Sequence, residues 1–278
     1  MKSIRLTAVA LGALLATSAA HAGTISLWGS SAAKPTGYVS GTAINPSGAN
    51  NKYLQWSVSD TEFPEYGIFT ITAKGYATAN NNGTGAFSQR DLERYSGGLG
   101  VCDDTSCSSP QHATDNDGKD DLILIDLGVG HTYSPTQFSI GWTAYGDCTA
   151  THEANSCPDI QAWIGNDFDA SQGWAGITSG WTRILSGDPS NDIQPGQDYY
   201  FGAGVGRYLI IAPQTGSEQC VQFNRRQQCT NMQYDYFKLE SLVFEATKSS
   251  EVPEPASAAL VGVTLASLLA IGRRRRQR

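Results

Sequence analysis

The chain is poor in charge and in the side chains that carry most catalysis. Only 16% of its 278 residues are charged, and four are histidines. It has no G-x-S-x-G element and no H-E-x-x-H element, which excludes the usual nucleophile elbow and the zincin helix. Carboxylates are plentiful, and a glycoside hydrolase needs only two acids that converge across a cleft, so that class stays open. We predict that the protein is not an enzyme.

Positive charge is scarce along most of the chain. There are 19 bases against 26 acids, a formal net charge of −7. The segment from Gly23 to Ser250 is more acidic, at about −12, because seven of the bases but only two of the acids lie outside it. Such a surface repels nucleic acid and anionic lipid and suits divalent cations and neutral sugars. We therefore predict no nucleic-acid partner.

Long apolar runs are missing except at the two ends. At the N-terminus, Lys2 and Arg5 precede an apolar stretch over 6–15, and Ala20-His21-Ala22 forms an A-x-A cleavage site. This order is typical of a secretory signal peptide. We predict that residues 1–22 are removed on export and that the mature chain begins near Gly23.

The C-terminal run lies over 256–272 and contains no charged residue. As a helix its 17 residues cover about 25 Å, slightly less than the hydrocarbon core of a bilayer. The basic cluster behind it should stay on the cytoplasmic side, which would pin the chain in the inner membrane by its tail. That cluster consists of Arg273, Arg274, Arg275 and Arg276.

Directly before this run stands the sequence Val252, Pro253, Glu254, Pro255. The order of a Pro-Glu-Pro triplet, an apolar helix and an arginine cluster resembles the PEP-CTERM sorting signal of Gram-negative bacteria. The resemblance implies that residues 251–278 are recognised and removed by the membrane protease exosortase. It also implies delivery to the cell surface or the extracellular matrix of a biofilm, like other signals whose hydrophobic tail is discarded. A permanent membrane anchor is the alternative.

All six cysteines lie in the exported segment, where an even number in an oxidising compartment predicts disulfides. Fifteen connectivities are open, and pairing neighbours along the chain closes three short loops. We predict the pairs Cys102 with Cys107, Cys148 with Cys157, and Cys220 with Cys229. A zinc site is disfavoured because no C-x-x-C pair occurs.

The mature segment has the hydrophobic pattern of strands. Apolar residues alternate with polar ones in "IFTITAKGY" and "QFSIGWTAY", whereas "DLILIDLG" is apolar on both faces, as in a central strand. We expect further strands at "KYLQWSV", "IQAWIGN", "GWTRILSG", "RYLIIAPQ" and "DYFKLESLVFEA", with a bulge near Ser241 in the last. The expected fold is all-β: one domain over 23–250, an antiparallel two-sheet sandwich that includes the jelly-roll type.

The centre of the chain, "GGLGVCDDTSCSSPQHATDNDGKDDLILIDLG", resembles exosortase-dependent surface proteins. The likeness consists of a Gly-Leu-Gly-Val turn, a His-Ala-x-Asp-Asn element and an acid before an apolar strand. It implies a surface location and brings no assigned activity. The matching residues are Gly98, Leu99, Gly100, Val101, His112, Ala113, Asp115, Asn116 and either Asp120 or Asp121.

The stretch "DNDGKDD" raises the question of calcium. Hard cations favour acid-rich loops, and this one holds Asp115, Asp117, Asp120 and Asp121. The EF-hand template fails in either register, which leaves a non-EF calcium site or a polar turn that caps its own backbone. Asp167 and Asp169 in "GNDFDAS" form a weaker candidate.

Aromatic faces can stack on sugar rings, and the chain has six tryptophans. Trp142 alternates as a core residue, whereas Trp174 and Trp181 lie in the Gly-rich stretch "SQGWAGITSGW". We take these two as candidate sugar-stacking residues; core packing is the alternative.

Three functions therefore compete. The first is a non-enzymatic surface or matrix protein with a structural or adhesive role in exopolysaccharide. The second is a carbohydrate-binding module for exopolysaccharide or other surface glycans, dependent on calcium or not. The third is a secreted glycan hydrolase.

The sorting signal predicts the mass of the mature protein. Protein recovered unreduced from the native cell surface should lack both termini and, relative to the reduced form, six hydrogens. Intact mass spectrometry measures this directly. A mass that retains the arginine cluster would establish a resident membrane protein instead.

Overall fold

The computed structural model describes residues 22–26, 42–44, 52–59, 68–95, 97–102, 113–129, 131–143, 158–185, 193–215, 219–224, 226 and 229–248. Its strands are β1 (Ala22–Ser26), β2 (Thr42–Ile44), β3 (Tyr53–Ser59), β4 (Ile68–Thr78), β5 (Phe87–Tyr95), β6 (Gly98–Cys102), β7 (Thr114–Asp115), β8 (Asp121–Asp126), β9 (His131–Thr143), β10 (Ile160–Gly165), β11 (Thr182–Leu185), β12 (Asp198–Tyr200), β13 (Tyr208–Pro213), β14 (Gln219–Phe223), β15 (Cys229–Gln233) and β16 (Tyr236–Lys248). A 3-10 turn, η2 (Ala170–Gln172), leads into the helix α1 (Gly173–Gly180).

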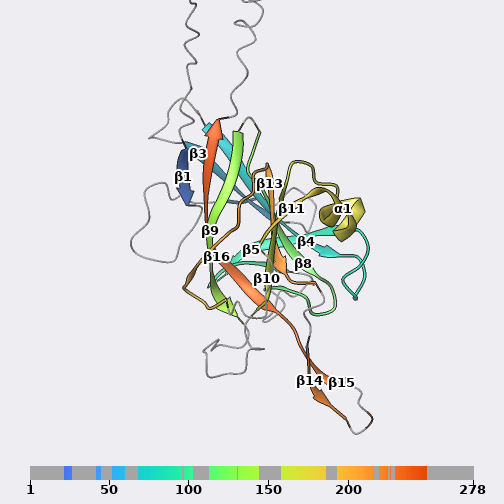
Figure 1. Cartoon of the computed structure of the whole chain (residues 1–278). Helices are drawn as coiled ribbons and strands as arrows, with labels where there is room; N and C mark the ends of the chain where they lie inside the picture. Colours follow the sequence, from blue (N-terminus) through green and yellow to red (C-terminus); the bar gives the residue numbers. More distant parts are fainter. Residues whose placement is uncertain are drawn as a thin grey trace, which may run out of the picture.

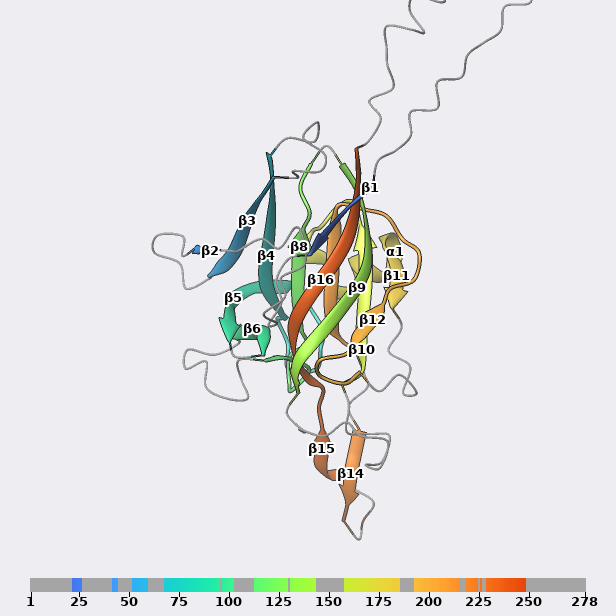
Figure 2. The same ribbon diagram turned by 90° about the vertical axis from the view of Figure 1, so that its left-hand side faces the viewer.

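The protein is all-β and antiparallel, as predicted, but two separate sheets are not confirmed. Fourteen strands form one continuous sheet in the order β11-β10-β13-β8-β4-β5-β6-β16-β9-β12, with β1, β2, β3 and β7 paired alongside. β5 joins the two halves, because its residues 87–90 pair with β4 and its residues 91–95 pair with β6. The sheet thus curls so that its halves face each other (Figures 1 and 2).

β8 is the central strand of one half, as its unbroken apolar run predicts. Ile123 and Ile125 point into the main core, which includes Phe138 and Phe244 from the other half-sheet. Leu122 and Leu124 point the opposite way, into a second apolar cluster on the outer face of the half-sheet that contains β8. We call this face, which runs over β3, β4, β8, β13 and β10, the outer face.

The predicted strands and the bulge are confirmed. β16 pairs with β9 in a register that shifts between Leu239 and Ser241, next to the change of phase seen in the sequence. The register shifts a second time between Lys238, which lies opposite Trp142, and Leu239. The prediction that Trp142 is a core residue is wrong. Trp142 is half-buried and lies against Lys238, whose Nζ is 4.5 Å from the ring centroid, so it is not a core residue.

The Gly-Leu-Gly-Val element is a strand rather than a turn. It forms β6, and Gly98 adopts φ +125, in the left-handed region that favours glycine. A Cβ atom on Gly98 would lie 2.3 Å from the carbonyl oxygen of Leu239 on β16. The glycine therefore allows two backbones to approach more closely than any other residue would.

The two terminal strands lie side by side. β1 pairs with β16, so that Ala22 is opposite Thr247 and Ser26 is opposite Val243. The point where β1 begins and the point where β16 ends therefore occupy the same end of the domain. The separate β14–β15 hairpin projects from the opposite end (Figures 1 and 2).

The predicted disulfides are only partly covered by the described residues. Cys102 is disulfide-bonded, and no cysteine in the described ranges is free. The hairpin register places Cys220 opposite Met232 and Cys229 opposite Phe223, so these two cysteines are not direct cross-strand partners. Cys107, Cys148 and Cys157 lie outside the described residues, and the three pairings stay predictions.

Gly98→Ala should destabilise the protein. Both the positive φ and the approach to the Leu239 carbonyl oppose a side chain, so we expect a loss of about 2 kcal/mol or more in the free energy of unfolding. Urea denaturation followed by tryptophan fluorescence measures the change. The matched control is Gly180→Ala at the end of α1, where nothing lies within 4 Å of the new Cβ. It should leave stability unchanged or raise it by up to about 1 kcal/mol. Equal stability of the two variants would contradict the packing account.

Candidate functional site

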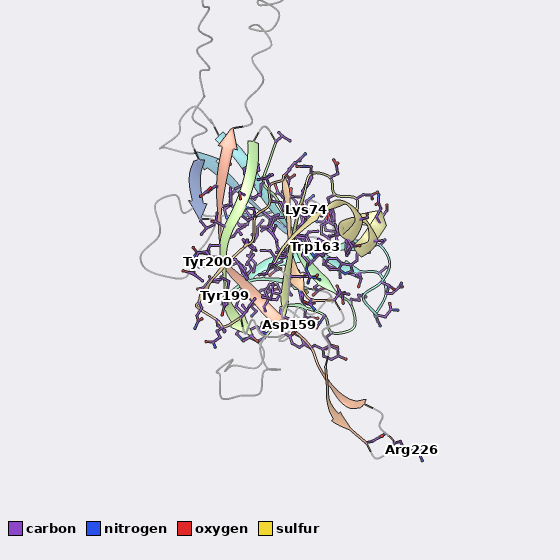
Figure 3. The ribbon with its side chains drawn as sticks, viewed as in Figure 1. Lys74, Asp159, Trp163, Tyr199, Tyr200 and Arg226 are labelled. Carbon is purple, nitrogen blue, oxygen red and sulfur yellow. The ribbon has the colours of Figure 1, made fainter. Side chains whose placement is uncertain are left out.

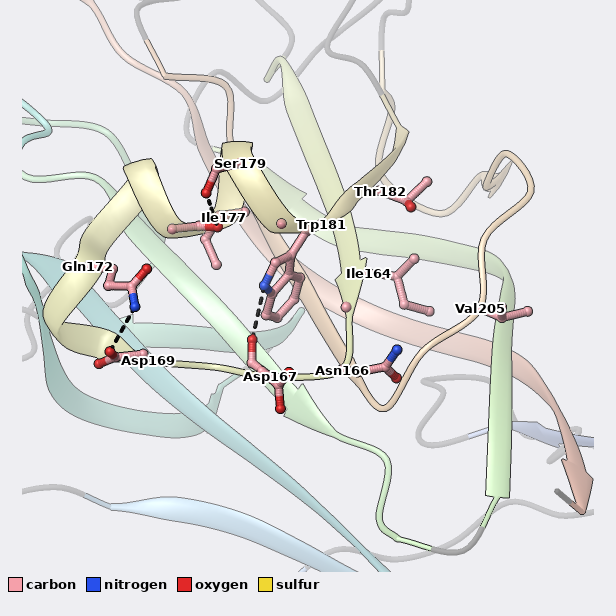
Figure 4. Close-up of a pocket in the computed structure, with 13 residues that line it drawn as sticks. Ile164, Asn166, Asp167, Asp169, Gln172, Ile177, Ser179, Trp181, Thr182 and Val205 are labelled. Atoms are coloured by element: carbon pink, nitrogen blue, oxygen red, sulfur yellow. Dashed lines mark hydrogen bonds between the residues drawn. The ribbon is translucent and has the colours of Figure 1, made fainter. Parts of the chain in front are cut away.

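A pocket of about 390 Å³ opens where the chain leaves β10 and returns along α1 (Figure 4). Its walls come from the end of β10, the loop over 166–169, the second half of α1, the start of β11 and Val205. The volume lies within the range usual for small-ligand sites. The site is therefore built by residues 166–181, which cross the outer face between β10 and β11; we call this segment the excursion.

Local hydrogen bonds shape this excursion. Asp169 caps η2: one carboxylate oxygen accepts from the backbone N–H and the hydroxyl of Ser171. The other accepts from the Gln172 amide. The Ser171 hydroxyl, followed by the Ser171 N–H and the Gln172 amide, lowers the pKa of the Asp169 carboxyl below its ordinary value. Asp169 therefore serves mainly to position η2 and α1.

Trp181 is held in place from several sides. A Cβ on Gly165 would lie 2.4 Å from the Trp181 ring, so the indole occupies the space that the missing side chain leaves. Its Nε1 donates to the carbonyl oxygen of Asp167 at 3.0 Å, and the edge of Phe168 meets it at a centroid distance of 6.3 Å. The ring is half-buried and lines the pocket.

Trp174 has a different role from the one predicted. It packs edge-on against Phe87 at 5.3 Å, and its Nε1 donates to Oδ2 of the buried Asp120. It belongs to the apolar packing beneath α1 and is absent from the residues that line the pocket. The structure therefore separates the two tryptophans that sequence spacing groups together.

Polar groups line the pocket beside the indole of Trp181. Asp167 and Thr182 are exposed, and Asn166 accepts a hydrogen bond from the backbone N–H of Arg207. Ser179 donates to the carbonyl oxygen of Gly176 (Figure 4). A rigid aromatic face beside a carboxylate, amides and hydroxyls can hold a small polar ligand that has one apolar face. The sequence analysis did not single out Thr182, which directly follows Trp181, or Val205, which reaches the pocket from a distant part of the chain.

The four acids of the calcium candidate do not converge. Asp115 accepts from the N–H of Asp117, Asp117 accepts from the Tyr236 hydroxyl, and Asp120 accepts from Trp174. Asp121 is buried at the start of β8. Within the described ranges, no three His, Cys, Asp or Glu side chains are grouped so as to hold a metal ion. Asp115 makes the self-capping turn that was the alternative to calcium.

The Asp-Asn part of the family-like element ties loops together. The Asn116 amide donates to Asp235 at 3.0 Å, and its oxygen accepts from the backbone N–H of Asp235 at 2.7 Å. Asp235 also accepts from the N–H of Asp159, just before β10. Asn116 and Asp235 are both buried, so this pair joins the start of β16 to the strands of the other half-sheet.

Several predicted residues cannot be placed. His112, His152, residues 1–21 of the predicted signal peptide and the sorting-signal residues lie outside the described residues. In the part of the chain that is described, no helix is both long and apolar enough to span a bilayer. The apolar run over 256–272 lies outside the described residues.

Comparison with protein-family models, with curated proteins and with solved structures finds no match to this chain.

The hydrogen bonds of the acid cluster predict that calcium has little effect on stability. Saturation of a true site at one hundred times its Kd would add about 2.7 kcal/mol and raise Tm by several degrees. We expect a change below about 1 °C between chelator and millimolar calcium in a thermal melt. If calcium raised Tm by several degrees and Asp117→Asn abolished that rise, the acid-rich loop would be a calcium site after all.

Proposed function

We propose that this chain is an exported surface or matrix protein, sorted by exosortase, whose β-domain binds glycan without cleaving it. Its role would be adhesive, within exopolysaccharide or at other surface glycans of a biofilm. The observation that carries the proposal is the fixed, half-buried indole of Trp181 in a pocket lined by polar groups. In this proposal the curled sheet is a continuous variant of the predicted sandwich.

Sugar chemistry suits this pocket. A pyranose ring has one face of C–H groups, which stacks on an aromatic ring, and a rim of hydroxyls, which exchange hydrogen bonds with carboxylates and amides. Trp181 offers such a ring, and Asp167 and Thr182 offer exposed polar groups beside it. Because the indole is held by Gly165, Phe168 and Asp167, a ligand would lose little free energy in ordering it.

Hydrolysis is less well supported than binding. Glycoside hydrolysis requires a general acid whose pKa is raised so that it stays protonated near neutral pH. The pKa of Asp169 is instead lowered by its hydrogen bonds, so this carboxyl is ionised under the same conditions. We therefore propose binding alone.

The placement of the terminal strands is compatible with sorting at a membrane. The signal peptide ends where β1 begins, and the sorting signal follows β16, whose last residues lie beside β1. Both segments would leave the domain at the same end. The tail would then pin the domain transiently by that end until exosortase removes it.

Trp181→Ala should weaken retention of the mature domain on purified native exopolysaccharide by about tenfold, because one stacked aromatic contributes about 1.4 kcal/mol. Affinity electrophoresis in gels that contain the polymer measures this. Trp142→Ala is the matched control and should keep retention, since Trp142 is also half-buried but lies on β9 in the other half-sheet.

Asp167→Ala provides a second variant that should keep the fold, because Asp167 is an exposed loop residue. It should also weaken retention while Tm stays unchanged. If wild type and both pocket variants migrate alike, the glycan-binding proposal fails.

A further inference from the structure

A row of polar side chains crosses the outer face next to the pocket. The register pairs Gly165 with Tyr208, Tyr208 with Asp126, Asp126 with Thr72, and Thr72 with Gln55. These five residues lie on five neighbouring strands, so the row runs perpendicular to the strands. Four spacings between strands amount to about 19 Å. We call the residues Tyr208, Asp126, Thr72 and Gln55, together with Arg207, the strip.

The strip is half-exposed, ordered and polar. Arg207 donates to both oxygens of Asp126 at 2.8 and 2.7 Å, and its guanidinium lies 4.6 Å from the centroid of the Tyr208 ring. The Gln55 amide donates to the Thr72 hydroxyl at 3.5 Å. The next row of the same face contains Trp163 and Lys74 (Figure 3). The strip thus offers an aromatic ring on β13, a carboxylate paired with Arg207 on β8, a hydroxyl on β4 and an amide on β3.

Pocket and strip are continuous. The ring of Trp181, which lines the pocket, lies 6.4 Å from the ring of Tyr208, with 31° between the planes. Asn166, which also lines the pocket, accepts a hydrogen bond from the N–H of Arg207. A ligand that occupies the pocket therefore has the first residues of the strip beside it.

The charges of the strip indicate a neutral ligand. Arg207 is the strip's cation and Asp126 its anion, and they neutralise each other in a bidentate pair. The pocket adds the carboxylates of Asp167 and Asp169, and the neighbouring row adds the cations Lys74 and Arg183, so the charges around the strip nearly cancel. An anionic polymer would gain no net attraction here, whereas a polymer of neutral sugars needs none.

We infer that the Trp181 pocket is the end subsite of a longer site, in which a linear neutral polysaccharide runs across the strands from Trp181 to Gln55. This inference rests on the proposed glycan binding and extends it. It identifies the ligand as an extended segment of polymer rather than a single sugar. A surface that contacts several units gains affinity with each one, up to the length of the strip.

The test measures the affinity of the mature protein for sugars of increasing length. The probes are size fractions from a partial hydrolysate of the purified neutral exopolysaccharide, from single sugars to hexamers, with polygalacturonate as an anionic polymer. Isothermal titration calorimetry compares wild type with the double variant Thr72→Ala and Gln55→Ala, and with Trp181→Ala. Thr178→Ala serves as control, because Thr178 is exposed on α1 and does not line the pocket.

We expect affinity to rise at least tenfold from single sugars to hexamers. The double variant should lose about tenfold for hexamers and nothing for the shortest fractions, whereas Trp181→Ala should weaken all of them. Equal affinity at every length, without an effect of the double variant, would overturn the strip and leave the pocket as the binding site. Tighter binding of polygalacturonate would overturn the neutral ligand. If no fraction binds, glycan binding itself fails.

Discussion

The burial of β8 on both faces is the constraint on which the rest of the structure depends. Ile123 and Ile125 are covered by the facing half of the curled sheet. Leu122 and Leu124 need a cover of their own, because apolar area left in water would cost about 25 cal/mol per Å². The segment over 166–181 supplies that cover with Phe168, Ile177 and Trp174. The excursion that forms the pocket therefore exists first to complete a hydrophobic layer.

Once this cover is in place, small residues decide where its aromatic side chains lie. Gly165 leaves room for the Trp181 ring on the outer face, and Gly173 brings the start of α1 against the loop at Gly85. Phe168 contacts Tyr76, Phe87, Trp181 and Tyr208, so it links α1 to three strands. The pocket is therefore supported by packed residues, which favours recognition of a ligand without rearrangement of the protein.

The residues that resemble exosortase-dependent surface proteins have structural roles in this fold. Gly98 allows β6 to approach β16, and Asn116 holds Asp235 at the start of β16. β16 in turn pairs with β1 and leads toward the predicted sorting signal. The element thus maintains the strand on which the C-terminal tail is carried, while the proposed glycan site lies on the other half-sheet. The predicted sorting and the proposed binding would therefore depend on different parts of the domain.

Local patterns in the sequence determined the strands, the all-β class, the double-faced burial of "LILI" and the bulge near Ser241, because alternation of apolar and polar residues directly reflects which face of a strand is buried. The Gly-rich stretch "SQGWAGITSGW" marked Trp181 and Trp174 together as candidate stacking residues. The sequence could not show that only Trp181 lines the pocket, that Val205 lies near Thr182, or that β5 continues one half-sheet into the other. Those outcomes depend on which strands pair across long stretches of chain and on the space left by Gly165. Only the tertiary structure decides them, because pairing and packing are set by contacts between residues far apart in the sequence.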